Sequence, residues 1–141
     1  MIKPFKYILL ALLISACEPT IGPCVHINEE PILSIQSVHS IDAQTDISSI
    51  VIFDVFIDGV SISPSFFIDD LSENISVEDS LITCSIPCGF GTMEGTYLFS
   101  VTADGYQEST ITQNVAYGTS GGSCPSSSSN GTKISFSLIP E

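Results

Sequence analysis

Cysteines are the residues of this chain whose type and spacing suggest the most chemistry. The sequence contains five of them, namely Cys17, Cys24, Cys84, Cys88 and Cys124. Cys17 follows an apolar N-terminal run, which leaves an even set of four. Four cysteines in an exported chain are typical of two disulfides, with three possible connectivities. Zinc would use the same thiols, but a C-x3-C pair followed by one distant cysteine lacks metal-finger spacing.

Carboxylates are dense in the middle of the chain and raise the question of calcium. Asp69, Asp70 and Glu73 are the candidate ligands, because Ca²⁺ requires several oxygen atoms close together. The D-x-[DN]-x-[DN]-G calcium loop is absent, however, and acidic residues at strand ends commonly keep sheet edges soluble. We therefore expect no resident metal and no cofactor.

Nucleophilic and redox catalysis have weaker support. The two histidines, His26 and His39, accompany no G-x-S-x-G motif, and no spacing indicates a base within reach of a serine. Both histidines are interpreted as isolated surface residues. Cys84 and Cys88 could form a redox pair, but thiol oxidoreductases use C-x2-C at a helix start, which favours a structural disulfide. We predict that the chain is not an enzyme.

The N-terminal segment has the features of an export signal. Two lysines precede an eight-residue apolar run at residues 7–14, and two small residues follow. This run is too short to span a bilayer, which takes about 20 apolar residues, and the order is that of a secretory signal. The junction at residues 14–17 resembles a bacterial lipobox, which implies a signal peptide at 1–16 and a lipid on Cys17. Glu18 is not the aspartate that retains lipoproteins at the inner membrane, which implies the outer membrane of a bacterial cell envelope.

Charge excludes nucleic acid as a partner. Removal of the leader would leave Lys133 as the single lysine or arginine against sixteen aspartates and glutamates. Such a chain is repelled by phosphate backbones and by anionic lipid surfaces. We therefore expect it to reach the membrane through its lipid anchor, with an envelope protein or a glycan as partner.

Composition and alternation predict an all-β domain at residues 31–141, after a tether at residues 17–30. Ile, Val, Phe, Ser and Thr dominate, and no helical period of a dozen residues follows the leader. Strands are predicted at residues 31–39, 50–57, 60–68, 80–86, 96–103, 109–117 and 133–140. Asp58-Gly59 and Asp104-Gly105 are expected to form tight turns. Together these elements predict a single antiparallel β-sandwich of about seven strands.

The alternation also predicts which side chains fill the core. In the second predicted strand, Val51, Phe53, Val55 and Ile57 are expected on one face, opposite Ile50, Ile52 and Phe56. In the third, the expected inward set is Val60, Ile62, Phe66 and Ile68. Pro64 interrupts that strand and predicts an edge or a bulge.

Residues 95–106, which read GTYLFSVTADGY, resemble the signature of carboxypeptidase regulatory-like domains. These domains are transthyretin-like β-sandwiches, in which the pattern marks a hairpin. The resemblance implies that Gly95 opens a strand, that Tyr97 packs inward, that Gly105 forms a turn and that Tyr106 folds back onto the sandwich. It implies a fold module without catalytic residues of its own.

The same layout suggests a disulfide pairing. If the first and last strands run side by side in parallel, Cys24 and Cys124 meet at one end of the domain. Cys84 would then pair with Cys88. The function implied by these features is a membrane-anchored, non-catalytic binding or scaffolding module, acting through the loops at residues 89–95 and 118–131. The alternatives are an accessory or inhibitory subunit of an envelope enzyme and a calcium-binding adhesion module.

Overall fold

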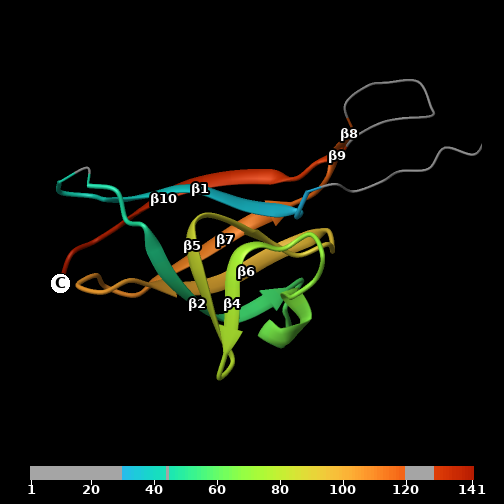
Figure 1. The fold of residues 1–141 in the computed structure, drawn as a ribbon, viewed down its shortest axis with the longest axis horizontal. Helices are drawn as coiled ribbons and strands as arrows, with labels where there is room; N and C mark the ends of the chain where they lie inside the picture. Colours follow the sequence, from blue (N-terminus) through green and yellow to red (C-terminus); the bar gives the residue numbers. More distant parts are fainter. Residues whose placement is uncertain (1–29, 44, 120–128) are drawn as a thin grey trace, which may run out of the picture.

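The computed structural model describes residues 30–43, 45–119 and 129–141, which form an all-β domain (Figure 1). One 3₁₀ turn, η1 (Pro64–Phe67), interrupts the strands. In the described part of the chain, no helix has the length and apolar character needed to cross a bilayer. The strands are β1 (Leu33–Ser40), β2 (Ser49–Ile57), β3 (Val60–Ser61), β4 (Glu73–Glu78), β5 (Leu81–Phe90), β6 (Gly95–Thr102), β7 (Ser109–Val115), β8 (Gly118–Thr119), β9 (Ser129–Asn130) and β10 (Thr132–Leu138).

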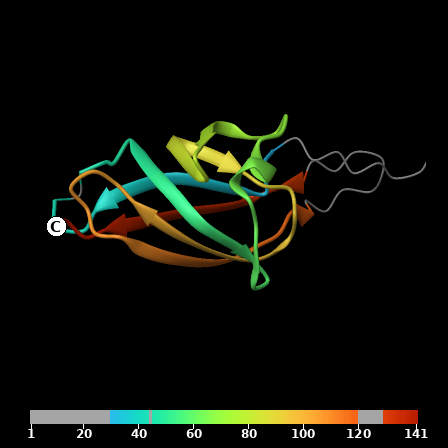
Figure 2. The same ribbon diagram turned by 90° about the horizontal axis from the view of Figure 1, so that it is seen from below.

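Eight strands form one sheet that curls into a nearly closed barrel (Figures 1 and 2). Its order is β10-β1-β5-β2-β6-β7, with β3 added to β2 and β4 added to β5. β1 and β10 are parallel, and the other paired strands are antiparallel. β8 and β9 form a separate two-stranded ribbon. The predicted all-β class is confirmed, whereas a sheet of eight strands in one curled layer replaces the expected antiparallel sandwich of about seven strands.

The two outer strands of this path, β7 and β10, approach each other at both ends. At one end the Thr132 hydroxyl donates to the Ala116 carbonyl and accepts from the Ala116 N–H, both at 3.0 Å. Beyond the other end, the Gln107 N–H donates to the Ile139 carbonyl at 2.8 Å. Apolar side chains on β7 and β10 pack against the core but are only partly buried, namely Ile111, Ile134 and Phe136. The barrel is therefore closed between β7 and β10 by hydrogen bonds at the ends of these strands and by the packing of their side chains.

A bulge at Asp54 exchanges the two faces of β2. Asp54 has a φ of 50°, and the pairing of β2 with β6 is irregular at this point. Ile50 and Ile52 are buried before the bulge, whereas Val55 and Ile57 are buried after it. The predicted division of this strand into two faces is therefore wrong, because one extra residue changes which alternate side chains point inward.

The segment predicted as a strand at residues 60–68 is mostly a 3₁₀ turn. Pro64 lies in the first turn of η1, where its missing N–H leaves no hydrogen bond unmade. The turn buries Phe67 completely and leaves Val60, Phe66 and Ile68 more than half exposed. The predicted inward set is therefore wrong for these three residues.

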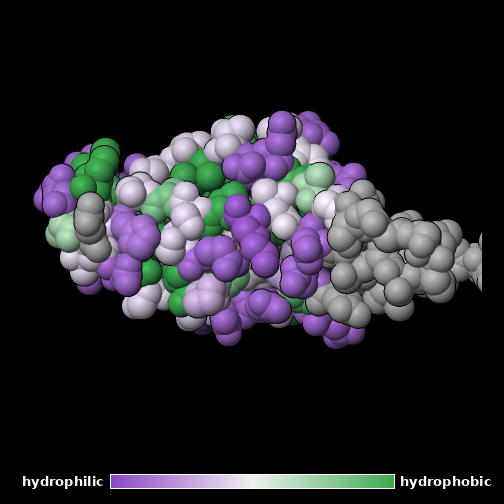
Figure 3. Space-filling model, turned by 90° about the horizontal axis from the view of Figure 1, so that it is seen from above, coloured by the Kyte–Doolittle hydropathy of each residue, from purple (hydrophilic) through white to green (hydrophobic). Residues whose placement is uncertain are grey.

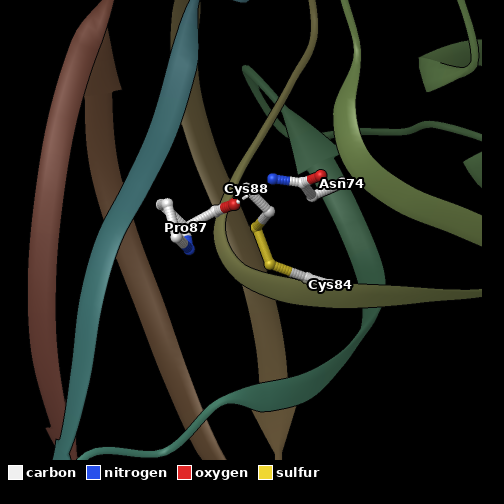
Figure 4. The surroundings of a disulfide bond; sticks show 4 residues. All are labelled: Asn74, Cys84, Pro87 and Cys88. Carbon is white, nitrogen blue, oxygen red and sulfur yellow. Dashed lines mark hydrogen bonds between the residues drawn. A yellow bond between two sulfur atoms is a disulfide. The ribbon is translucent and has the colours of Figure 1, made fainter.

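β5 bends sharply and carries the sheet from β2 to β1. Residues 82–85 pair with β2, and residues 88–90 pair with β1. A disulfide between Cys84 and Cys88 spans the bend, with Cα atoms 5.8 Å apart and both side chains buried. Beside it, the amide of Asn74 donates to a main-chain carbonyl within the bend at 2.8 Å (Figure 4). This disulfide therefore fixes a corner of the barrel.

One of the two predicted disulfides is thus confirmed. Cys24, Cys124 and the lipidation candidate Cys17 lie outside the described residues. The condition for the Cys24–Cys124 pairing, first and last strands side by side and parallel, is met by β1 and β10. The pairing itself stays a prediction.

Aromatic rings fill the core between η1, β5 and β6. The centroid of the Phe67 ring lies 5.3 Å from that of Phe90 and 6.4 Å from that of Tyr97. The ring centroids of Phe90 and Phe99 are 6.2 Å apart. The Tyr97 hydroxyl donates to the Met93 carbonyl at 2.8 Å. Burial, with a smaller contribution from Tyr117, raises the pKa of Tyr97 to about 12. Tyr97 therefore stays a neutral hydrogen-bond donor that holds the β5–β6 loop on the core.

The bulge gives a stability prediction for position 54. Asp54→Gly should keep or slightly raise the free energy of unfolding, because glycine adopts a positive φ without steric cost. Asp54→Val should lower it by about 1–2 kcal/mol, since a β-branched side chain is strained in the left-handed region. Urea unfolding measures both, with Ser76→Val on the exposed face of β4 as a control. Equal stability of the two position-54 variants would contradict the positive φ.

Candidate functional site

The barrel has two ends that carry different loops (Figures 1 and 2). One end holds Glu30, the first described residue, together with the β5–β6 loop at residues 91–94 and the β8–β9 ribbon. There the Tyr117 hydroxyl donates to the Glu30 carbonyl at 3.1 Å. The opposite end holds the β1–β2 loop at residues 41–48, the β6–β7 turn at residues 103–108 and the C-terminus. These are called the entry end and the remote end below.

Both loops predicted as binding loops lie at the entry end. The Gly91 carbonyl accepts a hydrogen bond from the Ile32 N–H at 2.9 Å, which ties the first loop to the start of the domain. The second loop includes the β8–β9 ribbon, while residues 120–128 lie outside the described part of the chain. The remote end was not identified from the sequence.

Three separate segments are joined at the remote end. The Ile41 N–H donates to the Leu138 carbonyl at 2.9 Å, and the Glu141 N–H donates to the Gly105 carbonyl at 3.1 Å. Ile41 and Ile139 are 57% and 46% exposed, and apolar surface lies beside hydrophilic side chains at this end (Figure 3, left). The surrounding carboxylates are also exposed, namely Asp42, Asp46, Asp104, Glu108 and Glu141. The remote end is therefore acidic and carries exposed isoleucines.

A groove of about 320 Å³ opens beside this end, between β1, the β1–β2 loop and the β5 corner. Val38 and Ile47 supply buried apolar side chains, and Ile86 and Pro87 from the corner form the opposite wall. The Val38 carbonyl accepts from the Ile47 N–H at 2.8 Å, which holds the loop against β1. The polar members of the lining are Gln36, Ser37, His39, Asp46 and Ser48. The groove thus combines an apolar wall with several hydrogen-bonding groups.

A chain of hydrogen bonds runs through three of these polar residues. His39 Nδ1 lies 2.7 Å from Asp46 Oδ1, and His39 Nε2 lies 3.1 Å from Ser37 Oγ. The Ser37 hydroxyl in turn donates to Ser135 Oγ on the neighbouring β10 at 2.8 Å. Because a carboxylate accepts hydrogen bonds only, Asp46 selects the imidazole tautomer with a proton on Nδ1. Nε2 of that tautomer can accept the Ser37 hydroxyl proton only after the hydroxyl turns away from Ser135 Oγ, to which it donates in this structure.

This order of groups is that of a serine nucleophile, a histidine base and an orienting carboxylate. The setting differs from that of a buried catalytic relay, because the His39 and Asp46 side chains are 40% and 86% exposed. Ser37 also lies within β1 and not on a sharp turn that presents its hydroxyl. The arrangement supplies hydrogen bonds for recognition, and a base positioned at one hydroxyl.

The sequence contained only a weak signal for this cluster. The prediction that His39 is an isolated surface residue is wrong, because His39 forms an antiparallel bridge with Asp46 across the β1–β2 loop. Ser37 and His39 are two residues apart on one strand, so their side chains share a face. The sequence feature that indicates this cluster is therefore the polar pair Ser37 and His39, two residues apart and followed by a short loop with aspartates.

The calcium candidates do not assemble into a site. In the described residues, no three histidine, cysteine, aspartate or glutamate side chains gather closely enough to hold a metal ion. Asp69 Oδ1 instead accepts a hydrogen bond from the Leu71 N–H at 2.8 Å, and the Asp69 carbonyl accepts from the Ser72 hydroxyl at 2.8 Å. Asp69 therefore closes a turn after η1; Asp70 is exposed within this turn, and Glu73 is exposed at the start of β4.

The Cys84–Cys88 pair is a poor redox centre in this setting. Cys84 is fully buried and Cys88 is 2% exposed, so an attacking thiolate has no direct approach to either sulfur. The pair also lies within a strand that three neighbours share. Its position supports the predicted structural role.

Comparison with known proteins adds no relative: no protein-family model, curated protein or solved structure matches this chain.

Proposed function

We propose that this chain is a lipid-anchored protein of the bacterial cell envelope whose β-domain is a binding module. Its lipid is carried by Cys17, and its recognition surface is the remote end with the adjoining groove. The observation that carries this proposal is the opposite placement of the two surfaces. Glu30 lies at the entry end, so a tether at residues 17–29 leaves the remote end directed away from the membrane (Figure 1).

Charge favours a basic protein as the partner. Five carboxylates surround the exposed Ile41 and Ile139, and His39 is the one basic side chain among the described residues of the remote end. Such a surface attracts cationic groups and repels anionic ones. A polypeptide segment with lysine or arginine beside apolar side chains fits both features, whereas a neutral glycan would use only the groove.

A relationship to carboxypeptidase regulatory-like domains is part of the proposal. The hairpin at residues 95–106 supports it, because Gly95 begins β6, Tyr97 is fully buried, Gly105 has a φ of 80° and Tyr106 packs against the core. In that relationship, the curled sheet is a closed variant of the transthyretin-like sandwich. η1 and β4 would then be additions to it.

The hydrogen-bond chain in the groove favours a second candidate function, acyl transfer to Ser37. In that step Ser37 Oγ forms a bond to an ester carbonyl carbon, and His39 Nε2 takes the hydroxyl proton. The proton then goes to the departing alcohol as the carbon–oxygen bond breaks, and water later releases the acyl group. The 3.1 Å distance between Ser37 Oγ and His39 Nε2 is the observation that supports it.

Anchoring is tested by replacing the lipidated cysteine. Cys17→Ala should move the protein from the membrane fraction to the soluble periplasmic fraction, because no thiol remains for acylation. Cys24→Ala should stay in the membrane fraction and carries the same chemical change a few residues away. Fractionation and the intact mass of the N-terminal peptide measure both results. A Cys17→Ala protein that stays with the membrane would contradict the anchor.

Recognition at the remote end is tested by site-specific photo-cross-linking in the producing cell. A photoreactive residue at position 41 should give one discrete adduct that contains a basic protein. The same residue at Leu81, which is 42% exposed on the β4–β5 hairpin, should give none. Adducts of equal yield at both positions, or a glycan adduct at position 41, would contradict a basic protein partner at this end.

The acyl-transfer function is tested with a fluorophosphonate probe. Ser37 should be labelled, and His39→Gln should slow labelling roughly 100-fold, because a positioned base contributes about 10²–10⁴ to such reactions. Ser48→Ala removes a hydroxyl from the same groove and should leave the rate unchanged. Peptide mass spectrometry locates the label, and circular dichroism checks the fold. Labelling that does not depend on His39 would rule out the relay.

A further inference from the structure

Exposed apolar side chains gather at the entry end of the barrel. Eight large apolar residues are well exposed in the described part of the chain, and four of them lie here. Their exposed fractions are 62% for Val60, 55% for Phe66, 56% for Ile68 and 42% for Met93. Single exposed apolar residues are ordinary on a soluble protein, whereas a group at one end indicates a contact surface.

Contacts hold the segments that carry three of these side chains, Met93, Phe66 and Val60. Met93 is held by the Tyr97 hydroxyl, and Phe66 packs edge-on against Phe67 with ring centroids 6.0 Å apart. Val60 follows the Asp58–Gly59 turn, whose Asp58 N–H donates to the Thr96 carbonyl at 2.9 Å. Figure 2 shows η1 and the β2–β3 turn in the half of the domain away from the C-terminus. The four side chains therefore lie on segments in the half of the domain that includes the entry end.

Carboxylates surround these apolar side chains. The Tyr117 N–H donates to Glu94 Oε1 at 3.3 Å, and Asp69 follows Ile68 directly. Burial, then the charges of Asp69 and Glu94, raise the pKa of Tyr117 above its ordinary value. Anionic lipid would be repelled by this arrangement, whereas the ammonium group of a zwitterionic headgroup would be attracted.

We propose that the entry end rests on a zwitterionic lipid surface, with Val60, Phe66, Ile68 and Met93 in the interfacial layer and the carboxylates against headgroup ammonium groups. This inference depends on the proposed anchor at Cys17, because residues 17–29 span at most roughly 45 Å and keep this end close to the bilayer. Apolar side chains on a polar rim are the usual means by which a protein lies on a membrane without crossing it. The lipid thereby both anchors and orients the domain.

The chain contains no tryptophan, so one introduced indole reports on one position. Phe66→Trp places it at the entry end, and Ile41→Trp places it at the remote end with nearly the same exposure, 55% against 57%. Each lipidated variant is reconstituted into vesicles of phosphatidylethanolamine and phosphatidylcholine, with or without bromine on the acyl chains. Bromine quenches only an indole that lies close to it, and thermal melts check that both variants fold.

F66W emission should fall at least twofold on brominated vesicles, whereas I41W emission should not change. If the protein floats with the vesicles but bromine quenches the two variants equally, docking is overturned and the anchor is left intact. Protein that does not float would overturn the anchor together with the docking that depends on it. A stable dimer of the soluble Cys17→Ala variant, dissociated by Phe66→Asp, would assign this end to a second copy and overturn lipid docking.

Discussion

The barrel depends on the bend in β5, because this one strand pairs with β2 on one side of the bend and with β1 on the other. Before the bend β5 pairs with β2, after it β5 pairs with β1, and β4 pairs with residues on both sides of the bend. The Cys84–Cys88 disulfide holds the bend covalently. Gly89 follows at once, and a Cβ at that position would collide with Pro31. Without this corner, β1 and its partner β10 would lose their strand pairing with the rest of the sheet.

Local signals in the sequence predicted the parts of the fold that local chemistry decides. Asp58 and Gly59 have φ values of 50° and 79°, which is the tight turn that an Asp-Gly pair favours between two strands. Regular alternation likewise placed Tyr97 and Phe99 in the core. In these cases each residue's own preference agrees with the position that the barrel gives it.

Where tertiary context decides, the same signals failed. Asp79 and Ser80 turn β4 into β5 with φ values of 49° and 63°, although neither is a glycine. Asp54 adopts a positive φ inside a strand, a conformation that costs little for aspartate and leaves no mark in the apolar pattern. The Ser37–His39–Asp46 cluster depends on a bridge across the β1–β2 loop, and no spacing rule predicts which loop residue returns to the strand.

The two termini lie at opposite ends of the barrel because of one feature of the topology, the parallel pairing of β1 with β10. When the first and last strands of a domain are parallel neighbours, the chain enters at one end and finishes at the other. The pairing of β1 with β10 has this effect, since Glu30 lies at the entry end and the Glu141 N–H bonds to Gly105 at the remote end. An antiparallel pair would bring both termini to one end, and an N-terminal anchor would then hold the C-terminal surface against the membrane. Parallel pairing instead places the acidic surface and the His39 groove at the end opposite Glu30.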